Sequence, residues 1–293
     1  MNAKTGMRAA IGKRAGLMFV TPAMLLIIAV MILPLFYTFY LSLHNVDFMQ
    51  LGSFLGLKNY KQVLTSPGNW MAIGRTLLVT VSATAISVVL GIVLALWVDA
   101  QKNAKYAYAI QIVSLIPWVT SMVVGALLWK WILDGELGLA NYLLSLFGQK
   151  PVLFLQTYAM QSLIFVVAWR TIGYSLVMVL AGLKGFSKDY IEAAQVDGAT
   201  PLQILLRIKL PILKTPIAVS MIVLSMSNFN NNIVPMTLTS GGPGETTTVI
   251  SLTLYRMGFT HYTFGTASAL AMILFAINAI MILIYIRVIK YEI

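Results

Sequence analysis

Long apolar stretches separated by short polar segments dominate the hydrophobic pattern of this chain. A helix needs about 20 apolar residues to cross the roughly 30 Å hydrocarbon core of a membrane. Six stretches reach that length, at about residues 16–43, 77–98, 106–133, 155–183, 213–240 and 264–287. Because lipid cannot satisfy an open backbone, each stretch is predicted to be helical. The pattern therefore predicts an all-α, polytopic membrane protein with six transmembrane helices.

The first apolar stretch follows four basic residues, as the apolar part of a secretory signal does. These residues are Lys4, Arg8, Lys13 and Arg14. The stretch runs on to Leu41 without a small-residue cleavage pattern, so we expect a retained membrane helix. Gly52–Trp70 then reads as an outer loop. We divide the chain into residues 1–70, which hold the N-terminus, first helix and outer loop, and a membrane domain at residues 71–293.

Composition and charge distribution set the orientation. The chain is 59% hydrophobic and 10% charged, against about 45–50% and about 25% in soluble domains. With a cytoplasmic N-terminus, thirteen basic residues fall inside: those four and Lys102, Lys105, Lys184, Lys188, Arg207, Lys209, Lys214, Arg287 and Lys290. The outer segments hold Lys58, Lys61, Arg75, Lys150 and Arg256. Both termini are therefore expected in the cytoplasm of a cell (inner) membrane protein. The scattered charge argues against nucleic-acid binding.

Several kinds of chemistry are excluded or disfavoured. The chain has no cysteine, and its two histidines, His44 and His261, are too far apart in the sequence for a metal site. No Gly-x4-Gly-Lys-Ser/Thr loop occurs, so we expect no catalytic residue, metal or cofactor in this chain. All nine acidic residues lie in predicted loops or at helix boundaries. A secondary transporter, which usually needs an intramembrane carboxylate for its coupling ion, is therefore disfavoured.

The longest cytoplasmic loop, residues 184–214, has the residue chemistry of two short helices and a hinge. Ser187 or Asp189 can cap a helix that ends at Gln195, Gly198 suits a left-handed C′ position, and Pro201 suits the first turn of a second helix. An apolar stripe at helical spacing follows at Ile204, Leu205 and Ile208. The pattern alone fits equally a helix on the lipid headgroups and a docking element.

The spacing of the whole loop favours docking. Glu192-Ala193-Ala194 is followed by Gly198 six positions after the glutamate, then by Ile208-x-Leu210-Pro211. This compound pattern resembles the EAA loop of bacterial ABC importer permeases, and Asp197-Gly198-Ala199 has the form of the carbohydrate-importer branch. The resemblance implies that the loop fills a cleft on a partner ATPase, which binds ATP and Mg. The implied docking residues are Glu192, Ala193, Ala194, Asp197, Gly198 and Pro201.

The membrane interior carries polar residues that lipid penalises. Arg170 lies in the fourth stretch, and Ser227–Asn232 places a run of amides in the fifth at a similar depth. Amides offer donors and acceptors to sugar hydroxyls, whereas Tyr174 and Phe229 offer aromatic surface. A snorkelling or water-facing arginine and amides that join helices remain alternatives. Pro117 predicts a kink in the third helix near the same region.

A second motif, Leu238-Thr239-x-Gly241-Gly242-Pro243, resembles that of the maltose and glycerol-phosphate permease type. The resemblance implies a five-helix ABC type I importer core, with the first helix against a second permease, plus an ATPase dimer, an extracytoplasmic solute-binding protein and surrounding lipid. It implies alternating access for a sugar substrate. The predicted substrate-binding residues are Arg170, Thr171, Tyr174, Asn228, Phe229, Asn230 and Asn231. Arg170 and the amides depart from the maltose pattern and so favour an anionic or more polar sugar derivative. A membrane scaffold or receptor would leave both motifs unexplained.

Overall fold

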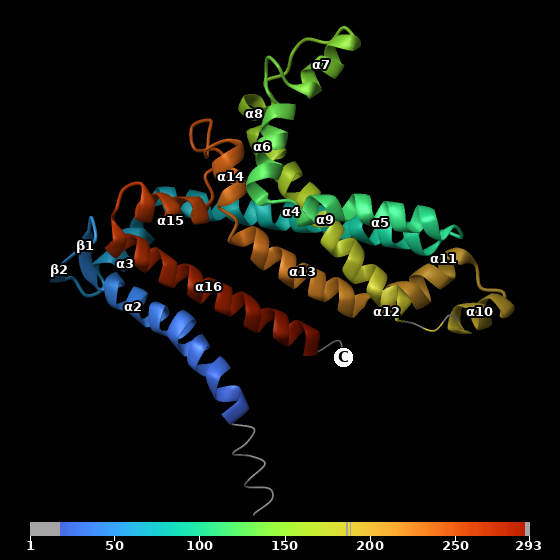
Figure 1. Cartoon of the computed structure of the whole chain (residues 1–293), viewed down its shortest axis with the longest axis horizontal. Helices are drawn as coiled ribbons and strands as arrows, with labels where there is room; N and C mark the ends of the chain where they lie inside the picture. The colour runs from blue at the N-terminus through green and yellow to red at the C-terminus, as the bar shows by residue number, and fades with distance from the viewer. Residues whose placement is uncertain (1–17, 186, 188, 291–293) are drawn as a thin grey trace, which may run out of the picture. The chain divides into compact units, whose positions relative to one another are not determined.

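The computed structural model describes residues 18–185, 187 and 189–290, with side chains up to residue 287 (Figure 1). The basic residues Lys4, Arg8, Lys13, Arg14 and Lys188 and the two ends of the chain lie outside the described residues or at their limit. The chain divides into two compact units: Met1–Thr65 with Arg256–Ala276, and Ser66–Tyr255 with Ile277–Ile293. We describe each unit by itself.

The first unit begins with the helical segment Met18–Ser42, which contains the π-helical turn η1 (Ile28–Ile32) and α2 (Leu33–Ser42). A hairpin of β1 (His44–Asp47) and β2 (Gln50–Phe54) follows, then α3 (Lys58–Thr65). The sequence predicted only a loop here. The hairpin turns at Phe48 and Met49, which both have positive φ. Asn-Gly or Asp-Gly usually occupies these two positions of a hairpin turn, and their absence here explains why the sequence did not predict the hairpin.

The second unit is built around α4 (Pro67–Asp99) and α9 (Ala159–Lys184), which pack along one another. α5 (Ala104–Val119) packs on α9, and α13 (Lys214–Phe229) packs on both α4 and α9. Small residues permit the close approach. A Cβ on Gly91 of α4 would lie 2.5 Å from the Cβ of Ser175 on α9. Close backbone approach through glycine is typical of helix pairs in membranes, where dispersion replaces the hydrophobic effect as the attraction.

Two pairs of helices meet at sharp bends, one inside the predicted third span and one where the predicted cytoplasmic loop joins the fifth span. α5 and α6 (Met122–Ile132) meet at a bend of 100°, three residues beyond Pro117, so the predicted kink is confirmed in this region (Figure 1). The segment Pro201–Ile212 and α13 meet at 57°. With each bent pair taken as one span, four unbroken helices and two bent pairs give the predicted number of six by length and composition, although the second pair includes residues 201–212, which the sequence assigned to the cytoplasmic loop.

The fifth stretch, predicted as one helix to residue 240, ends earlier. α13 stops at Phe229, and α14 (Ile233–Leu238) begins after Asn232. The side-chain oxygen of Asn231 accepts a hydrogen bond from the backbone N–H of Val234 at 3.1 Å. Asparagine side chains compete with the helix ladder for backbone groups in this way, which explains the interruption.

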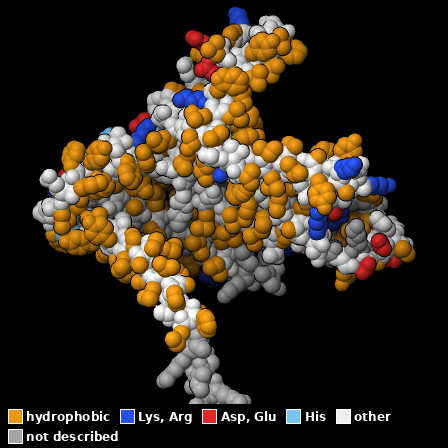
Figure 2. All heavy atoms as spheres, viewed as in Figure 1, with side chains coloured by type: hydrophobic (Ala, Val, Ile, Leu, Met, Phe, Trp, Pro, Cys, Tyr) orange, Lys and Arg blue, Asp and Glu red, His pale blue; other side chains and the backbone are white. Residues whose placement is uncertain are grey.

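The remaining helices are α7 (Leu139–Leu146), α8 (Phe154–Thr157), α15 (Ile250–Phe259) and α16 (Phe264–Lys290). On the face of the second unit shown in Figure 2, hydrophobic side chains cover the sides of the long helices. Charged side chains gather where α10 (Asp189–Val196) and α11 (Pro201–Ile204) lie and around α7. This distribution is that of a membrane-embedded protein, with charge at the ends of the apolar helices.

Candidate functional site

The predicted docking segment begins with α10 (Asp189–Val196). The hydroxyl of Ser187 accepts a hydrogen bond from the backbone N–H of Asp189 at 3.3 Å, and the helix extends one residue beyond the predicted end at Gln195. Gly198 has φ +78°, so the predicted left-handed position is confirmed. There the backbone N–H of Ala199 donates to the carbonyl of Ala194 at 2.9 Å, and this bond closes the helix end.

The second helix of the loop starts with a complete capping box. The side chain of Thr200 accepts from the backbone N–H of Gln203, while the side chain of Gln203 accepts from the backbone N–H of Thr200. Pro201 occupies the first helical turn of α11 (Pro201–Ile204), as predicted. The chain continues through the π-helical turn η2 (Leu205–Lys209) into α12 (Leu210–Ile212). Ile204 is buried and Ile208 is half-buried, so the predicted stripe faces inward.

The outer face of this segment is open. α10 has no buried residue, and Glu192, Ala193, Asp197 and Gly198 are exposed, whereas Ala194 is half-buried. Val196, at the end of α10, is 88% exposed. A short helix that buries none of its residues within its own chain leaves most of its side chains accessible to a partner, although Glu192 and Gln195 also line a cavity on its inner side.

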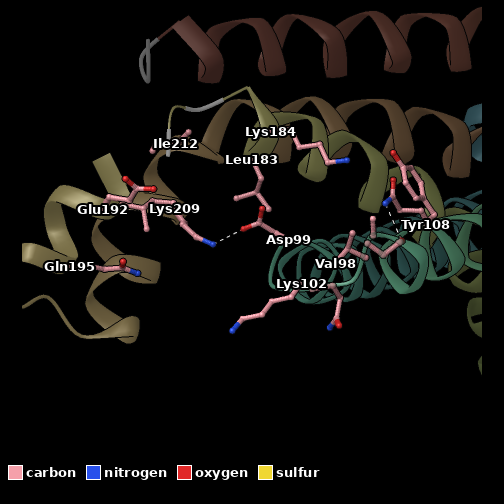
Figure 3. A pocket seen from close by; sticks show the side chains of 15 residues that line it. Val98, Asp99, Lys102, Tyr108, Leu183, Lys184, Glu192, Gln195, Lys209 and Ile212 are labelled. Atoms are coloured by element: carbon pink, nitrogen blue, oxygen red, sulfur yellow. Dashed lines mark hydrogen bonds and ion pairs between the residues drawn. The ribbon is translucent and has the colours of Figure 1, made fainter. Parts of the chain in front are cut away.

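A cavity of about 520 Å³ lies behind α10 (Figure 3). It is enclosed by the end of α4, the start of α5, the end of α9, and residues of α10 and η2. Glu192 and Gln195 line it from α10, and Lys184 lines it from α9. One ion pair crosses it: the Nζ of Lys209 lies 2.6 Å from an Oδ2 of Asp99. Sequence reasoning missed this pair because 110 positions separate its members.

In the membrane interior, Arg170 and Tyr174 share one aromatic neighbour. The guanidinium carbon of Arg170 lies 5.4 Å from the ring centroid of Trp118, and the Trp118 and Tyr174 ring centroids are 4.8 Å apart. Arg170 is half-buried, and its buried Nε has no hydrogen-bond partner in the described part of the chain. The bend after Pro117 thus brings α5 against α9 at these side chains, and a cation over an indole face is a favourable pair.

Three predicted substrate residues lie in helix contacts instead of on an open face. The hydroxyl of Thr171 is 2.7 Å from that of Ser87 on α4, and the amide of Asn228 donates to the hydroxyl of Thr84 on α4 at 3.1 Å. Phe229 is 1% exposed. For Asn228, this geometry matches the alternative of amides that join helices.

Asn230 is exposed and pairs with a residue that sequence reasoning missed. The amide of Asn230 donates to the Oδ1 of Asn278 on α16 at 3.0 Å, and the amide of Asn278 donates to the Oδ1 of Asn230 at 3.2 Å. The side-chain oxygen of its neighbour Asn231 accepts a hydrogen bond from the backbone N–H of Val234 in the first turn of α14. A single asparagine inside the apolar stretch 264–287 is the signal that could have drawn attention to Asn278. Within the described ranges, no group of three or more metal-ligating side chains occurs.

Comparison with known proteins places these features in a family. Residues 87–290 match the family described as binding-protein-dependent transport system inner membrane component. The chain is 34% identical over 262 residues to the "Probable ABC transporter permease protein y4oQ" of Sinorhizobium fredii, a match that covers 87% of this chain and 83% of the relative. It is 29% identical over 285 residues to the trehalose/maltose transport system permease protein MalF of Thermococcus litoralis, with 95% of each covered.

A solved structure supports the fold. The structure of a bacterial ABC transporter involved in the import of the acidic polysaccharide alginate aligns with a TM-score of 0.82 at 24% identity, over 95% of this chain and 96% of that chain. The resemblance drawn from the EAA loop and the Gly-Gly-Pro motif is therefore confirmed at the level of the family. This chain belongs to the inner-membrane components of binding-protein-dependent transport systems and is a non-catalytic permease subunit of an ABC importer.

Proposed function

We propose that this permease carries a sugar or sugar derivative, and that Glu192–Pro201 docks the partner ATPase that drives it. The open face of α10 carries the proposal: a helix with no buried residue exposes Glu192, Ala193 and Gly198 beside it. Small residues let a partner backbone approach closely, and the carboxylate offers it a charge-assisted hydrogen bond. The segment connects directly to α13 through η2 and α12, so motion at the dock reaches a membrane helix.

The proposed mechanism is alternating access. Closure of an ATPase dimer, which holds ATP and Mg, moves the docking segments of this chain and of a second, homologous permease. The membrane helices then rotate, and the cavity between the permeases opens toward an extracytoplasmic solute-binding protein. The positive-inside distribution supports cytoplasmic placement of both termini and of the docking segment.

The proposed substrate contacts are those side chains that the described residues leave accessible. Arg170 with Tyr174 offers a cation and an aromatic face, and Asn230 offers amide groups that sugar hydroxyls can match. The trehalose/maltose system relative supports a sugar as the class of substrate. An unpaired guanidinium in a low-dielectric site attracts anions, so Arg170 supports an anionic or strongly polar sugar derivative. Thr171, Asn228 and Phe229 then form the layer behind these contacts.

The docking proposal is tested by Glu192→Ala and Gly198→Asp in the complete transporter. Each is expected to leave ATP hydrolysis intact while uptake falls, because the weakened docking contact no longer transmits closure of the ATPase to the membrane helices. Gly148→Asp is the matched control. Gly148 also has a positive φ, +68°, and nothing near its Cβ position, so backbone strain is similar but lies in a different loop. Normal uptake in both docking variants would reject the assignment.

The substrate site is tested by Asn230→Ala. Uptake is expected to weaken while the assembled complex is recovered in normal amount. Failure to assemble would instead favour a purely structural role for the amide pair with Asn278.

A further inference from the structure

We propose that the Asp99–Lys209 ion pair is the second attachment point that makes the docking segment turn together with α4, so that both residues are positioning residues for transport. Lys209 is the variable position of the Ile208-x-Leu210-Pro211 motif, and Asp99 is the last residue of α4. Their charged atoms are 2.6 Å apart, and the two residues lie 110 positions apart in the sequence. The inference rests on the proposed docking function and adds to it the contact through which movement of the docking segment reaches α4.

The first attachment point is apolar. Leu213 is fully buried and shares one core cluster with Ala95 and Val98 of the last turn of α4 and with Leu176, Val179 and Leu180 of α9. A Cβ on Gly182 of α9 would lie 2.5 Å from Pro216 of α13, so these backbones are already close. Leu213 is therefore well held, but apolar packing is not directional and leaves the segment some freedom to rotate about this residue.

The ion pair removes that freedom. Lys209 precedes Leu213 by four residues, and Asp99 follows Val98 directly, so the two contacts join the same two elements about one helical turn apart. The contacts at Leu213 and Lys209 together restrict the angle between the docking segment and α4 more than the contact at Leu213 alone. The cavity behind α10 makes this link important, because Asp99 and Lys209 both line this space, where packing between α4 and α10 is incomplete.

Lys209 also sits at the end of a π-helical turn, in which the backbone N–H of Leu210 bonds to the carbonyl of Leu205. A π turn shifts the following residues around the helix axis relative to an α-helix. The wider turn therefore helps to set the direction in which the side chain of Lys209 leaves the segment.

The size of the interaction separates coupling from folding. The side chains of Lys209 and Asp99 are 21% and 26% exposed, and a partly exposed pair shifts an equilibrium by at most about fivefold. Loss of the pair should therefore leave the subunit assembled. It should lower by several-fold the fraction of ATPase closures that move α4.

The test measures sugar uptake and ATP hydrolysis together in the complete transporter reconstituted in liposomes. Asp99→Asn and Lys209→Gln are each expected to lower uptake per ATP hydrolysed by about twofold to fivefold, with assembly unchanged. The double reversal, Asp99→Lys with Lys209→Asp, is expected to restore the ratio to within about twofold. Equal falls in uptake and hydrolysis, or an unchanged ratio in the single variants, would overturn the proposal.

A covalent link guards against a reversal that fails to assemble. Because the chain has no cysteine, Asp99→Cys with Lys209→Cys introduces the only thiols of this subunit. A flexible bifunctional thiol reagent is expected to raise the uptake-to-hydrolysis ratio, and cleavage of the reagent to lower it again. A cross-linked subunit that stays uncoupled would refute the role of the link.

Two controls define what a failure means. Lys102→Gln and Lys184→Gln each remove a cation that lines the same cavity but forms no ion pair in the described part of the chain, and both should keep normal coupling. Glu192→Ala is measured beside them. If Glu192→Ala uncouples transport while the Asp99 and Lys209 variants do not, the link alone is wrong; if Glu192→Ala has no effect, the docking function itself fails.

Discussion

Gly91→Ala offers a direct test of how closely α4 and α9 pack. A Cβ at this position would lie 2.5 Å from both the Cβ and the Oγ of Ser175, and 2.9 Å from the backbone nitrogen of Leu176. Carbon atoms prefer about 3.5–4.0 Å, so the two helices would have to separate by about 1 Å. A gap of this size removes roughly a quarter to a half of the dispersion energy of each atom pair that it separates.

The expected cost follows from this geometry. Overpacking a close-packed interface destabilises a protein by about 1–3 kcal/mol. For a chain of a few hundred residues, this lowers the melting temperature by roughly 2–12 °C. Thermal unfolding of the purified transporter, followed by loss of monodisperse complex on heating, measures the shift. Uptake should fall as well, because Ser175 directly follows Tyr174 on α9.

Two further variants make the test specific. Gly74→Ala lies on the same helix, is exposed and has no atom within 4 Å of its Cβ position, so it should leave the melting temperature equal or higher. Ser175→Gly combined with Gly91→Ala should recover part of the loss, but not all, because Leu176 stays in the way. A Gly91→Ala variant as stable as the parent would mean that α4 and α9 do not cross here as closely as described.

Three other changes probe local contacts. Asn141→Ala should destabilise the loop between α6 and α9 by about 1–3 kcal/mol, seen as faster amide exchange, because its buried amide makes four hydrogen bonds to backbone groups. A double-mutant cycle of Ser87→Ala and Thr171→Val should give a coupling energy of about 0.6 kcal/mol and below about 1.7 kcal/mol, measured by thermal unfolding. Hydrogen bonds from backbone N–H groups, that of Leu137 first, lower the pKa of Asp134. The ionised form therefore holds this turn above the unfolded pKa of about 3.9 and releases it as pH falls through the lower folded value. The protection factor of the turn's amides, which is the exchange rate corrected for its intrinsic dependence on pH, should be flat from neutral pH to about pH 5 and fall in more acid solution, and Asp134→Asn should abolish that acid step.

Much of the fold was predictable because the relevant physics is local. An apolar stretch long enough to cross a membrane identifies a span without knowledge of its neighbours. The structure has four single helices of this kind and two bent pairs of helices, which together give the predicted number of six. Pro117 marked the bent third span. Gly198 and Pro201 marked the hinge of the docking segment, because each acts through its own backbone. The hairpin at Phe48 was not predicted, because its turn lacks the residues that usually adopt positive φ and so carries no local signal.

The class of protein, its apolar spans and the motif proposed for docking could thus be read from the sequence, because they depend on composition and short-range spacing. Only the tertiary structure decided which face of each helix meets another. α4 and α9 do not separate their residues into one strongly apolar and one strongly polar face, so no amphipathic pattern indicates their rotation. That rotation buries Thr171 and Asn228 against α4, pairs Asn230 with Asn278 and joins Asp99 to Lys209. These contacts link residues up to 144 positions apart, and their existence depends on packing that no local pattern encodes.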